Sequence, residues 1–210
     1  MSVKIRAIIF DLDGVLVDAT EWHYTALNRA LALFGYTITR YEHLTSYNGL
    51  PTRKKLEMLT VTKGLPRGLH RLLNAVKQKY TRQEILQNCV PVFDKEQMVS
   101  QLRRDGYRLA VCSNSIREST QLMLEGSSII NAFEFFLSNE DVEHPKPDPQ
   151  MYRLALGRLG IKPEEAVVVE DADPGVQAAK GAGTNVCRVI GYEEVTYSRI
   201  ANFIRKVESQ

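Results

Sequence analysis

Cysteine is scarce in this sequence of 210 residues, and long apolar runs are missing. The three cysteines, Cys89, Cys112 and Cys187, are widely spaced, so we expect neither a disulfide framework nor a zinc site. The expected environment is the reducing cytoplasm. No stretch approaches the roughly 18 consecutive apolar residues that a membrane span requires. The apolar run near the N-terminus soon meets Asp11 and Asp13, which is atypical of a signal peptide or a membrane anchor.

Charge is nearly balanced overall but unevenly distributed. The chain has a net charge of +2, whereas residues 20–90 carry 11 Lys or Arg against 4 Asp or Glu. Two interpretations stay open: the basic segment is a separate unit that faces an anionic small molecule, or it carries solvated side chains on helix surfaces. We expect no nucleic-acid partner and no membrane partner, and we favour a monomer.

Short apolar segments alternate with helical patterns outside residues 20–90. Such alternation predicts an α/β fold with a doubly wound parallel sheet that helices cover on both faces. Apolar residues recur at helical spacing over residues 94–105 and 150–160, so we expect helices there. The expected strands are residues 5–10, 107–112, 133–137, 166–169 and 185–190.

Residues 20–90 break this alternation, because they contain no strand pattern. Apolar spacing predicts helices over residues 21–34, 53–59, 69–79 and 82–89, and Gly35 suits the end of the first. We therefore predict two domains. Residues 1–19 and 91–210 would form the α/β core, and residues 20–90 would form a helical cap domain inserted after the first strand.

Polar side chains follow the predicted strands at or soon after the point where each strand ends. They are Asp11 and Asp13 after the first strand, Ser113 and Asn114 after the second, Lys146 in the loop after the third, and Glu170 and Asp171 after the fourth. In an open parallel sheet, ligands bind beyond the carboxyl ends of the strands. We therefore expect these side chains to share one site.

This set of side chains suits phosphoryl transfer. A carboxylate such as Asp11 can attack phosphorus and form an aspartyl-phosphate, which splits one difficult step into two. The approaching anions need neutralising, so we expect Mg²⁺ on Asp11, Glu170 and Asp171, together with the charge of Lys146. Asp13 could protonate the leaving oxygen and later deprotonate the second acceptor.

Four ordered motifs resemble those of the haloacid dehalogenase superfamily. They are FDLDGVLVD (10–18), VCSNS (111–115), HPKPDP (144–149) and VVVEDADPGVQAAKGAG (167–183). An isolated Asp-x-Asp would be weak evidence, whereas four motifs in order and in matching strand context are specific. The resemblance covers nearly the whole chain and implies a core of that superfamily's type with an all-helical cap.

The resemblance also implies a role for each motif residue. Asp11 would be the nucleophile and Asp13 the general acid and base. Asp11, the Asp13 backbone carbonyl, Glu170 and Asp171 would hold Mg²⁺. The residues that would grip the transferring phosphate are Ser113, Asn114 and Lys146.

Within the superfamily, the chain is most similar to the β-phosphoglucomutase-like and phosphoglycolate phosphatase-like branch. His23, twelve residues after Asp11, and Arg53 in NGLPTRKK match positions of that branch that contact the distal part of the substrate or the leaving oxygen. Ala19 departs from the branch, where many members have Thr or Ser. We expect a Mg²⁺-dependent phosphatase that hydrolyses a small sugar phosphate or phosphorylated organic acid, and a sugar-phosphate mutase stays open as the alternative.

Two other classes of protein agree less well with the motifs. A phospho-receiver domain also combines an acidic cluster, a Ser or Thr and a Lys, but its phosphorylated Asp follows a middle strand and no helical cap intervenes. A catalytically silent binding module would not need an intact set of Asp11, Asp13, Ser113, Lys146 and Asp171. Both interpretations are therefore disfavoured.

Overall fold

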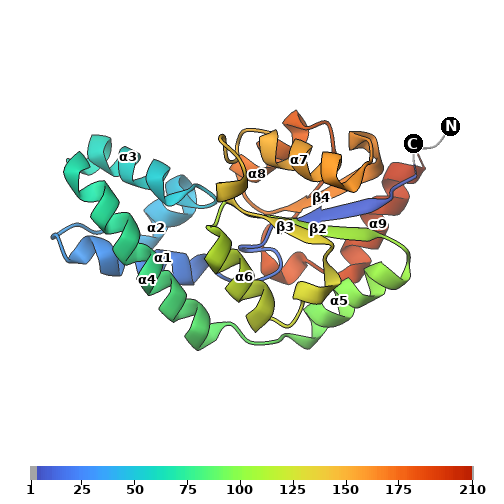
Figure 1. Cartoon of the computed structure of the whole chain (residues 1–210), viewed down its shortest axis with the longest axis horizontal. Coiled ribbons are helices and arrows are strands. Elements are labelled where there is room, and N and C mark those ends of the chain that lie inside the picture. The colour runs from blue at the N-terminus through green and yellow to red at the C-terminus, as the bar shows by residue number, and fades with distance from the viewer. Residues whose placement is uncertain (1–3, 210) are drawn as a thin grey trace.

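The computed structural model describes residues 4–209 and consists of an α/β core with a helical unit at one end (Figure 1). The core sheet has the strand order β3-β2-β1-β4-β5, and every neighbouring pair is parallel. The strands are β1 (Ala7–Phe10), β2 (Arg108–Cys112), β3 (Phe135–Leu137), β4 (Ala166–Glu170) and β5 (Asn185–Arg188). The predicted fold class, a helix-covered parallel α/β sheet, is confirmed.

Strand β1 lies at the centre of the sheet and is apolar on both faces. Its side chains at Ile8 and Phe10 pack into one core cluster, whereas those at Ala7 and Ile9 pack into the other. This division follows from the two-residue period of a strand, which sends successive side chains to opposite faces. Both faces are covered by helices, so β1 has no polar side chain until the chain leaves the sheet at Asp11.

Helices cover the two faces of the sheet in separate groups. Met98, Met123 and Ile200, from α5, α6 and α9, pack with Ile8, while Ala155 of α7 and the small residues of α8 pack on the opposite face. The core helices are α5 (Phe93–Arg104), α6 (Arg117–Gly126), α7 (Gln150–Leu159), α8 (Asp173–Gly181) and α9 (Tyr197–Glu208). The sequence pattern predicted α5 and α7 and gave no bounds for α6, α8 and α9.

The segment between β1 and α5 is helical, and we call residues 20–88 the cap. Its elements are α1 (Thr20–Ala32), α2 (Arg40–Glu42), the π-helical turn η1 (His43–Tyr47), α3 (Thr52–Lys63), the 3₁₀ turn η2 (Arg67–Leu69) and α4 (His70–Asn88). The expectation of two helices over 69–79 and 82–89 is wrong, because α4 is continuous. Lys77, Thr81 and Ile85, one turn apart, are all buried, so one stripe runs through the expected break. The predicted domain boundaries stay a prediction.

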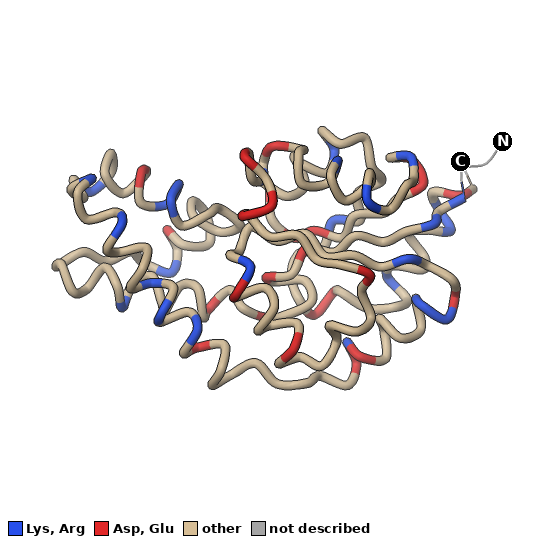
Figure 2. The backbone as a smooth tube through the Cα atoms, viewed as in Figure 1, with Lys and Arg blue, Asp and Glu red and all other residues tan. Residues whose placement is uncertain are grey.

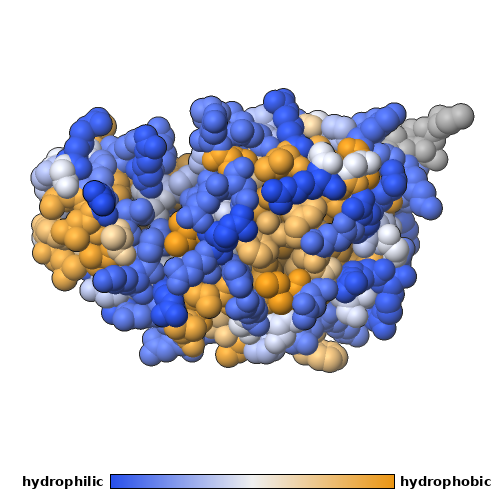
Figure 3. Space-filling model, in the orientation of Figure 1, coloured by the Kyte–Doolittle hydropathy of each residue, from blue (hydrophilic) through white to orange (hydrophobic). Residues whose placement is uncertain are grey.

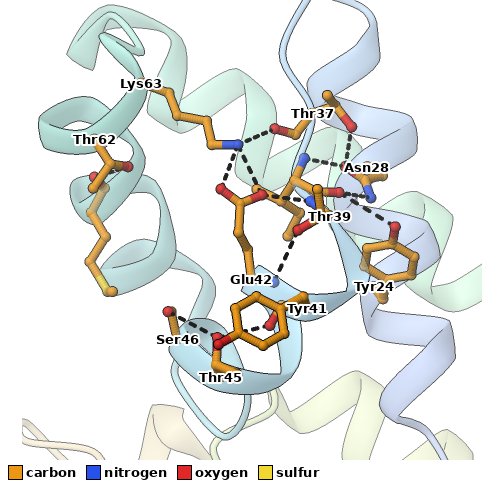
Figure 4. Close-up of polar contacts among 12 residues, drawn as sticks. Tyr24, Asn28, Thr37, Thr39, Tyr41, Glu42, Thr45, Ser46, Thr62 and Lys63 are labelled. Atoms are coloured by element: carbon orange, nitrogen blue, oxygen red, sulfur yellow. Dashed lines mark hydrogen bonds and ion pairs between the residues drawn. The ribbon is translucent and has the colours of Figure 1, made fainter.

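A polar network fixes the chain between α1 and α3 within the cap (Figure 4). The Asn28 side chain accepts from the backbone N–H of Ile38 at 2.9 Å and donates to its carbonyl at 2.9 Å. Thr39 and Glu42 form a reciprocal capping box at the start of α2. Lys63 Nζ, at the end of α3, lies 2.8 Å from Glu42 Oε1. These contacts tie α3 to α1 through the intervening loop.

Lys and Arg positions outnumber Asp and Glu positions along the backbone of the cap (Figure 2), in line with the composition of residues 20–90. The space-filling view shows a notch between the cap and the core (Figure 3). Within residues 4–209, no helix combines the length and the apolar character that a membrane crossing demands.

Candidate active site

A cavity of about 140 Å³ lies where the carboxyl ends of the strands face the cap. Both parts of the chain contribute to its wall. The core supplies Asp11, Asp13, Asn114, Ser115, Lys146, Glu170 and Asp171, and the cap supplies His23, Arg53, Lys55 and Lys77 among others. The polar residues that the sequence placed after separate strands therefore converge, and they face a basic set of cap residues.

Lys146 lies at the centre of the core side of the site. Its Nζ donates to Asp11 Oδ1 at 2.6 Å, to Glu170 Oε1 at 2.6 Å and to the carbonyl of Cys112 at 2.7 Å. Only 3% of Lys146 is exposed. Burial would lower the pKa of Lys146, but the carboxylates of Asp11 and Glu170 raise it above its ordinary value. The ammonium therefore stays charged beside Asp11.

Asp11, Glu170 and Asp171 form an acidic cluster that fits a divalent cation. Each brings a potential ligand atom within 4.8 Å of the others. Burial, followed by the charge of Glu170, raises the pKa of Asp11 well above its ordinary value and that of Asp171 to about 7. Among the described residues, the buried Asp171 Oδ1 has no hydrogen-bond partner. Close carboxylates resist joint ionisation, and Mg²⁺ prefers such oxygen ligands.

The backbone beside this cluster requires glycine. A Cβ at Gly175 would lie 1.8 Å from Glu170 Oε1, and one at Gly14 would lie 2.5 Å from Asp171 Oδ2. Gly14 also has a φ of +85°, a conformation that glycine adopts without strain. These two glycines let the backbone approach the carboxylates closely.

Tyr152 orients Glu170, a role that the sequence pattern did not reveal. Its hydroxyl donates to Glu170 Oε1 at 2.5 Å, and the residue is fully buried. Burial, together with the nearby charge of Glu170, raises the pKa of Tyr152 well above its ordinary value, so the hydroxyl stays a donor. Helical periodicity identified Tyr152 only as part of an apolar stripe, since the pattern reports the face of a helix and not the partner of a hydroxyl.

Asp13 is held by three polar side chains. Its Oδ2 accepts from Ser113 Oγ at 2.9 Å and from Ser115 Oγ at 3.0 Å, while its Oδ1 lies 2.5 Å from His23 Nε2. Burial would raise the pKa of Asp13, but the imidazole and the two hydroxyls hold it below its usual range. Ser115 belongs to the VCSNS motif, yet the sequence alone gave it no role.

His23 connects Asp13 to the cap residue Lys77. Lys77 Nζ lies 3.2 Å from His23 Nδ1. An ammonium has no lone pair and must donate, so Nδ1 is the acceptor and Nε2 carries the proton directed at Asp13. Burial and the neighbouring Lys77 charge lower the pKa of His23, which agrees with a neutral ring. Lys77 thus donates to His23, and His23 donates to the Asp13 carboxylate.

The Asn114 side chain is bound by backbone groups on both sides of the site. Its Oδ1 accepts from the N–H of Lys146 at 3.0 Å, and its Nδ2 donates to the carbonyls of Lys146 at 3.1 Å and Gly49 at 2.9 Å. Gly49 belongs to the cap, and Asn139 in turn donates to the Asn114 carbonyl. The side-chain amide is therefore already hydrogen-bonded. A contact of Asn114 with phosphate would be made by its backbone N–H.

Arg53 differs from the other predicted site residues in the exposure of its side chain. It borders the cavity, but its side chain is 90% exposed and its Nε lies 3.3 Å from Glu57 Oε1, one turn along α3. Exposed pairs of this kind contribute about 0.2–0.5 kcal/mol. A substrate contact of Arg53 stays a prediction, whereas the neighbouring Lys55 is buried and borders the same cavity.

Comparison with known proteins agrees with this geometry. Residues 8–189 match the family model described as haloacid dehalogenase-like hydrolase. A pyrophosphatase PpaX of Bacillus velezensis is 29% identical over 187 residues, which cover 89% of this chain and 83% of that protein. A phosphorylated carbohydrates phosphatase of Thermotoga maritima is 30% identical over 181 residues, which cover 85% and 82% respectively.

A solved structure shows the same fold over nearly the full length. The β-phosphoglucomutase of Clostridium difficile superposes with a TM-score of 0.85, covering 98% of this chain and all of that one. Because the two sequences are only 18% identical, the likeness concerns the fold alone.

Proposed function

We propose that this chain, which belongs to the haloacid dehalogenase-like hydrolase family and is a phosphoric monoester hydrolase, hydrolyses a small sugar phosphate or phosphorylated organic acid through an aspartyl-phosphate on Asp11. The observation that carries the proposal is the 2.6 Å contact between Asp11 and the buried ammonium of Lys146. A carboxylate beside a fixed cation can approach the anionic phosphate without strong repulsion.

In the first half-reaction, an Asp11 carboxylate oxygen forms a bond to phosphorus while the bond from phosphorus to the alcohol oxygen breaks. Lys146 balances the charge that accumulates between Asp11 and the phosphate. The departing oxygen takes a proton, and we assign its transfer to Asp13. Asp13 therefore enters this half-reaction protonated and leaves it as a carboxylate, which accepts the N–H of His23 Nε2, 2.5 Å from Asp13 Oδ1.

In the second half-reaction, water attacks the phosphorus and the Asp11 carboxylate leaves. Asp13 accepts the proton of that water, a role that suits a carboxylate whose pKa is held below its usual range. Ser113 and Ser115 donate to Asp13 Oδ2, and His23 Nε2 lies 2.5 Å from Oδ1, so these three side chains hold the carboxylate in one orientation beside the site. We assign the phosphate contacts to the backbone N–H of Asn114, to Lys146 and to Ser113, whose hydroxyl would turn from Asp13 Oδ2 to the phosphate when the substrate binds.

The acidic cluster of Asp11, Glu170 and Asp171 would hold Mg²⁺, with the Asp13 backbone carbonyl as a further ligand. The ion supplies charge neutralisation at the phosphate when it is bound. Tyr152 and Lys146 both donate to Glu170 Oε1, which fixes the orientation of this carboxylate. We further propose that the cap acts as a separate domain, with the boundaries of residues 20–90 that the sequence predicts, and that it closes over the site and excludes water.

A screen of phosphate release over some tens of phosphorylated metabolites, with and without Mg²⁺, tests the proposal. We expect Mg²⁺-dependent release from a sugar phosphate or a phosphorylated acid, and none from the Asp11→Asn variant, which keeps the shape and loses the nucleophile. A Lys54→Met variant is the control, because Lys54 is exposed on α3. Equal activity of Asp11→Asn and the unmodified chain would refute the mechanism.

A sugar-phosphate mutase is the second candidate. The close packing of the cap on the core favours the mutase, because a Cβ at Gly49 of the cap would lie 2.8 Å from Ala172 Cβ of the core. A cap packed this closely keeps water from the phosphorylated Asp11. Ala19, which lacks a hydroxyl at the start of the cap, favours hydrolysis. Incubation with glucose 1-phosphate and a bisphosphate activator distinguishes them: isomer formed much faster than inorganic phosphate supports the mutase.

A further inference from the structure

Two lysines of the cap are buried without a carboxylate partner. Only 6% of Lys55 and 5% of Lys77 is exposed. Among residues 4–209, neither ammonium lies within 4.0 Å of an acidic side chain, and the one polar contact of the pair is that of Lys77 with His23. A buried charge is costly unless it is paired.

Other buried lysines of this protein have the partners that Lys55 and Lys77 lack. Lys146 contacts two carboxylates, and Lys95 donates to the carbonyls of Tyr192 and Val195 at 2.7 Å each. Burial lowers the pKa of Lys55 to about 8 and that of Lys77 to about 7. The two cap ammoniums are therefore the ones that an added anion would stabilise.

The position of the two lysines connects them to the reaction site. Both line the cavity that Asp11 and Lys146 also line. Each is close enough to Asp13 for that carboxylate to raise its pKa, and Lys55 lowers the pKa of Lys77. Lys55 and Lys77 thus line this cavity from the cap, and Lys146 lines it from the core.

We infer that Lys55 and Lys77 form a second anion subsite, which binds a carboxylate or second phosphate carried by the substrate at the end away from the transferring phosphate. This inference rests on the proposed function and narrows it to substrates with two anionic groups. The contact with the distal part of the substrate, which the sequence analysis predicted for Arg53, is thereby assigned to Lys55. The register of α3 supports this, since Lys55 lies buried beside Leu56, whereas Arg53 and Lys54 are exposed.

The test uses three related esters: ethyl phosphate with a neutral tail, 2-phosphoglycolate with a carboxylate tail, and ethylene glycol bisphosphate with a second phosphate. The measured quantity is the ratio of kcat/KM for each anionic-tailed ester to that for ethyl phosphate. We expect the full chain to prefer at least one anionic-tailed ester, and Lys55→Met to reduce that preference tenfold or more. The ester preferred identifies carboxylate or phosphate as the group bound.

Lys54→Met is the matched control, because it removes the same charge from an exposed neighbour on the same helix. We expect it to leave the preference within twofold of the full chain. An equal loss of preference in Lys54→Met would show that general surface charge is responsible and would overturn the subsite. A preference that Lys55→Met retains would overturn it as well.

A binding measurement separates failure of the subsite from failure of the proposed function. In the Asp11→Asn background, we expect 2-phosphoglycolate or the bisphosphate to raise Tm more than ethyl phosphate does, and the added Lys55→Met substitution to remove the difference. Absence of turnover with all three esters would contradict the proposed function for these substrates, while this Tm difference still decides the subsite. Equal Tm shifts for all three esters would overturn the subsite.

Discussion

The Asn114 amide nitrogen donates a hydrogen bond of 2.9 Å to the carbonyl of Gly49 and thereby joins the core to the cap beside the reaction site. The same side chain binds both the N–H and the carbonyl of Lys146. One amide group therefore contacts the cap and positions the backbone of the lysine that contacts Asp11. We therefore expect closure of the cap and the placement of Lys146 to be coupled through Asn114.

Replacement of Asn114 by Asp should weaken this coupling. The variant keeps an acceptor for the Lys146 N–H, but it presents an oxygen instead of a donor to the carbonyls of Gly49 and Lys146. We expect kcat/KM to fall about tenfold or more, because replacing a hydrogen bond by repulsion between two oxygens costs roughly 1–3 kcal/mol. Steady-state kinetics check this, with Asn202→Ala, an exposed site on α9, as the control. Unchanged kinetics in the Asp variant would exclude the coupling.

Replacement of Gly49 by Ala should hold the cap away from the core. The new Cβ would lie 2.8 Å from Ala172 Cβ, and Gly49 has a φ of +71°, which a side chain disfavours. We expect KM to rise several-fold, with a loss of stability of about 1 kcal/mol. Kinetics and thermal melting test both effects, and Gly64→Ala, which has a φ of +71° but open space around the Cβ, controls for the backbone strain. Matching KM values in the two variants would contradict the contact.

Mg²⁺ should stabilise the protein through the acidic cluster. A ligand that binds only the folded state at 100 times its Kd adds about 2.7 kcal/mol to the free energy of unfolding. We expect Mg²⁺ to raise Tm in the full chain and to have little effect in Asp171→Asn. Tyr152→Phe, which removes the donor to Glu170 Oε1, should need a higher Mg²⁺ concentration for the same shift. A Tm that is independent of Mg²⁺ would argue against a metal at this cluster.

The stability gained by Lys55→Met should depend on pH. Burial lowers the pKa of Lys55 to about 8 in the folded protein from an ordinary 10.5. Between these values the unfolded chain binds more protons, so the stability of the unmodified protein rises with pH across this window. The penalty of the buried charge is therefore largest below pH 8 and vanishes above about pH 10.5.

Removal of that charge should raise the free energy of unfolding by on the order of 1 kcal/mol or more at pH 7, and by progressively less up to about pH 10. Urea unfolding at several pH values provides the measurement, with Lys54→Met as the control. A loss of stability in Lys55→Met at pH 7 would mean that Lys55 has a structural partner and would count against its role in binding an anion.

Much of the core side of the site was predictable from the sequence, because it lies at strand ends. Apolar strands followed at once by Asp11 or by Glu170 fix both the element and the position of the polar group relative to the sheet. Parallel order then brings the polar residues to one edge, as the structure shows for Asp11, Lys146 and Glu170. Local patterns suffice where position along a buried strand determines position in space.

The cap side was less predictable, because its contacts depend on helix register and on tertiary packing. Arg53 and Lys55 are two residues apart in one basic run, and only the packing of Leu56 and Leu59 into the cap core decides which of them is buried. The expected break within α4 was wrong for a related reason, since burial of Thr81 continues a stripe that polar neighbours obscure. The direction of the Asn114 amide likewise depends on Gly49, which is 65 residues away.

Identification of the phosphorylated residue tests the central claim most directly. The enzyme is mixed with its best substrate and Mg²⁺, quenched within one turnover and treated with borohydride, which reduces an aspartyl-phosphate to homoserine. Peptide mass mapping then locates the modified residue. We predict homoserine at position 11, dependent on substrate, and none in Asp11→Asn. Homoserine at position 13, or full turnover with Asp11 unmodified at every quench time, would contradict nucleophilic attack by Asp11.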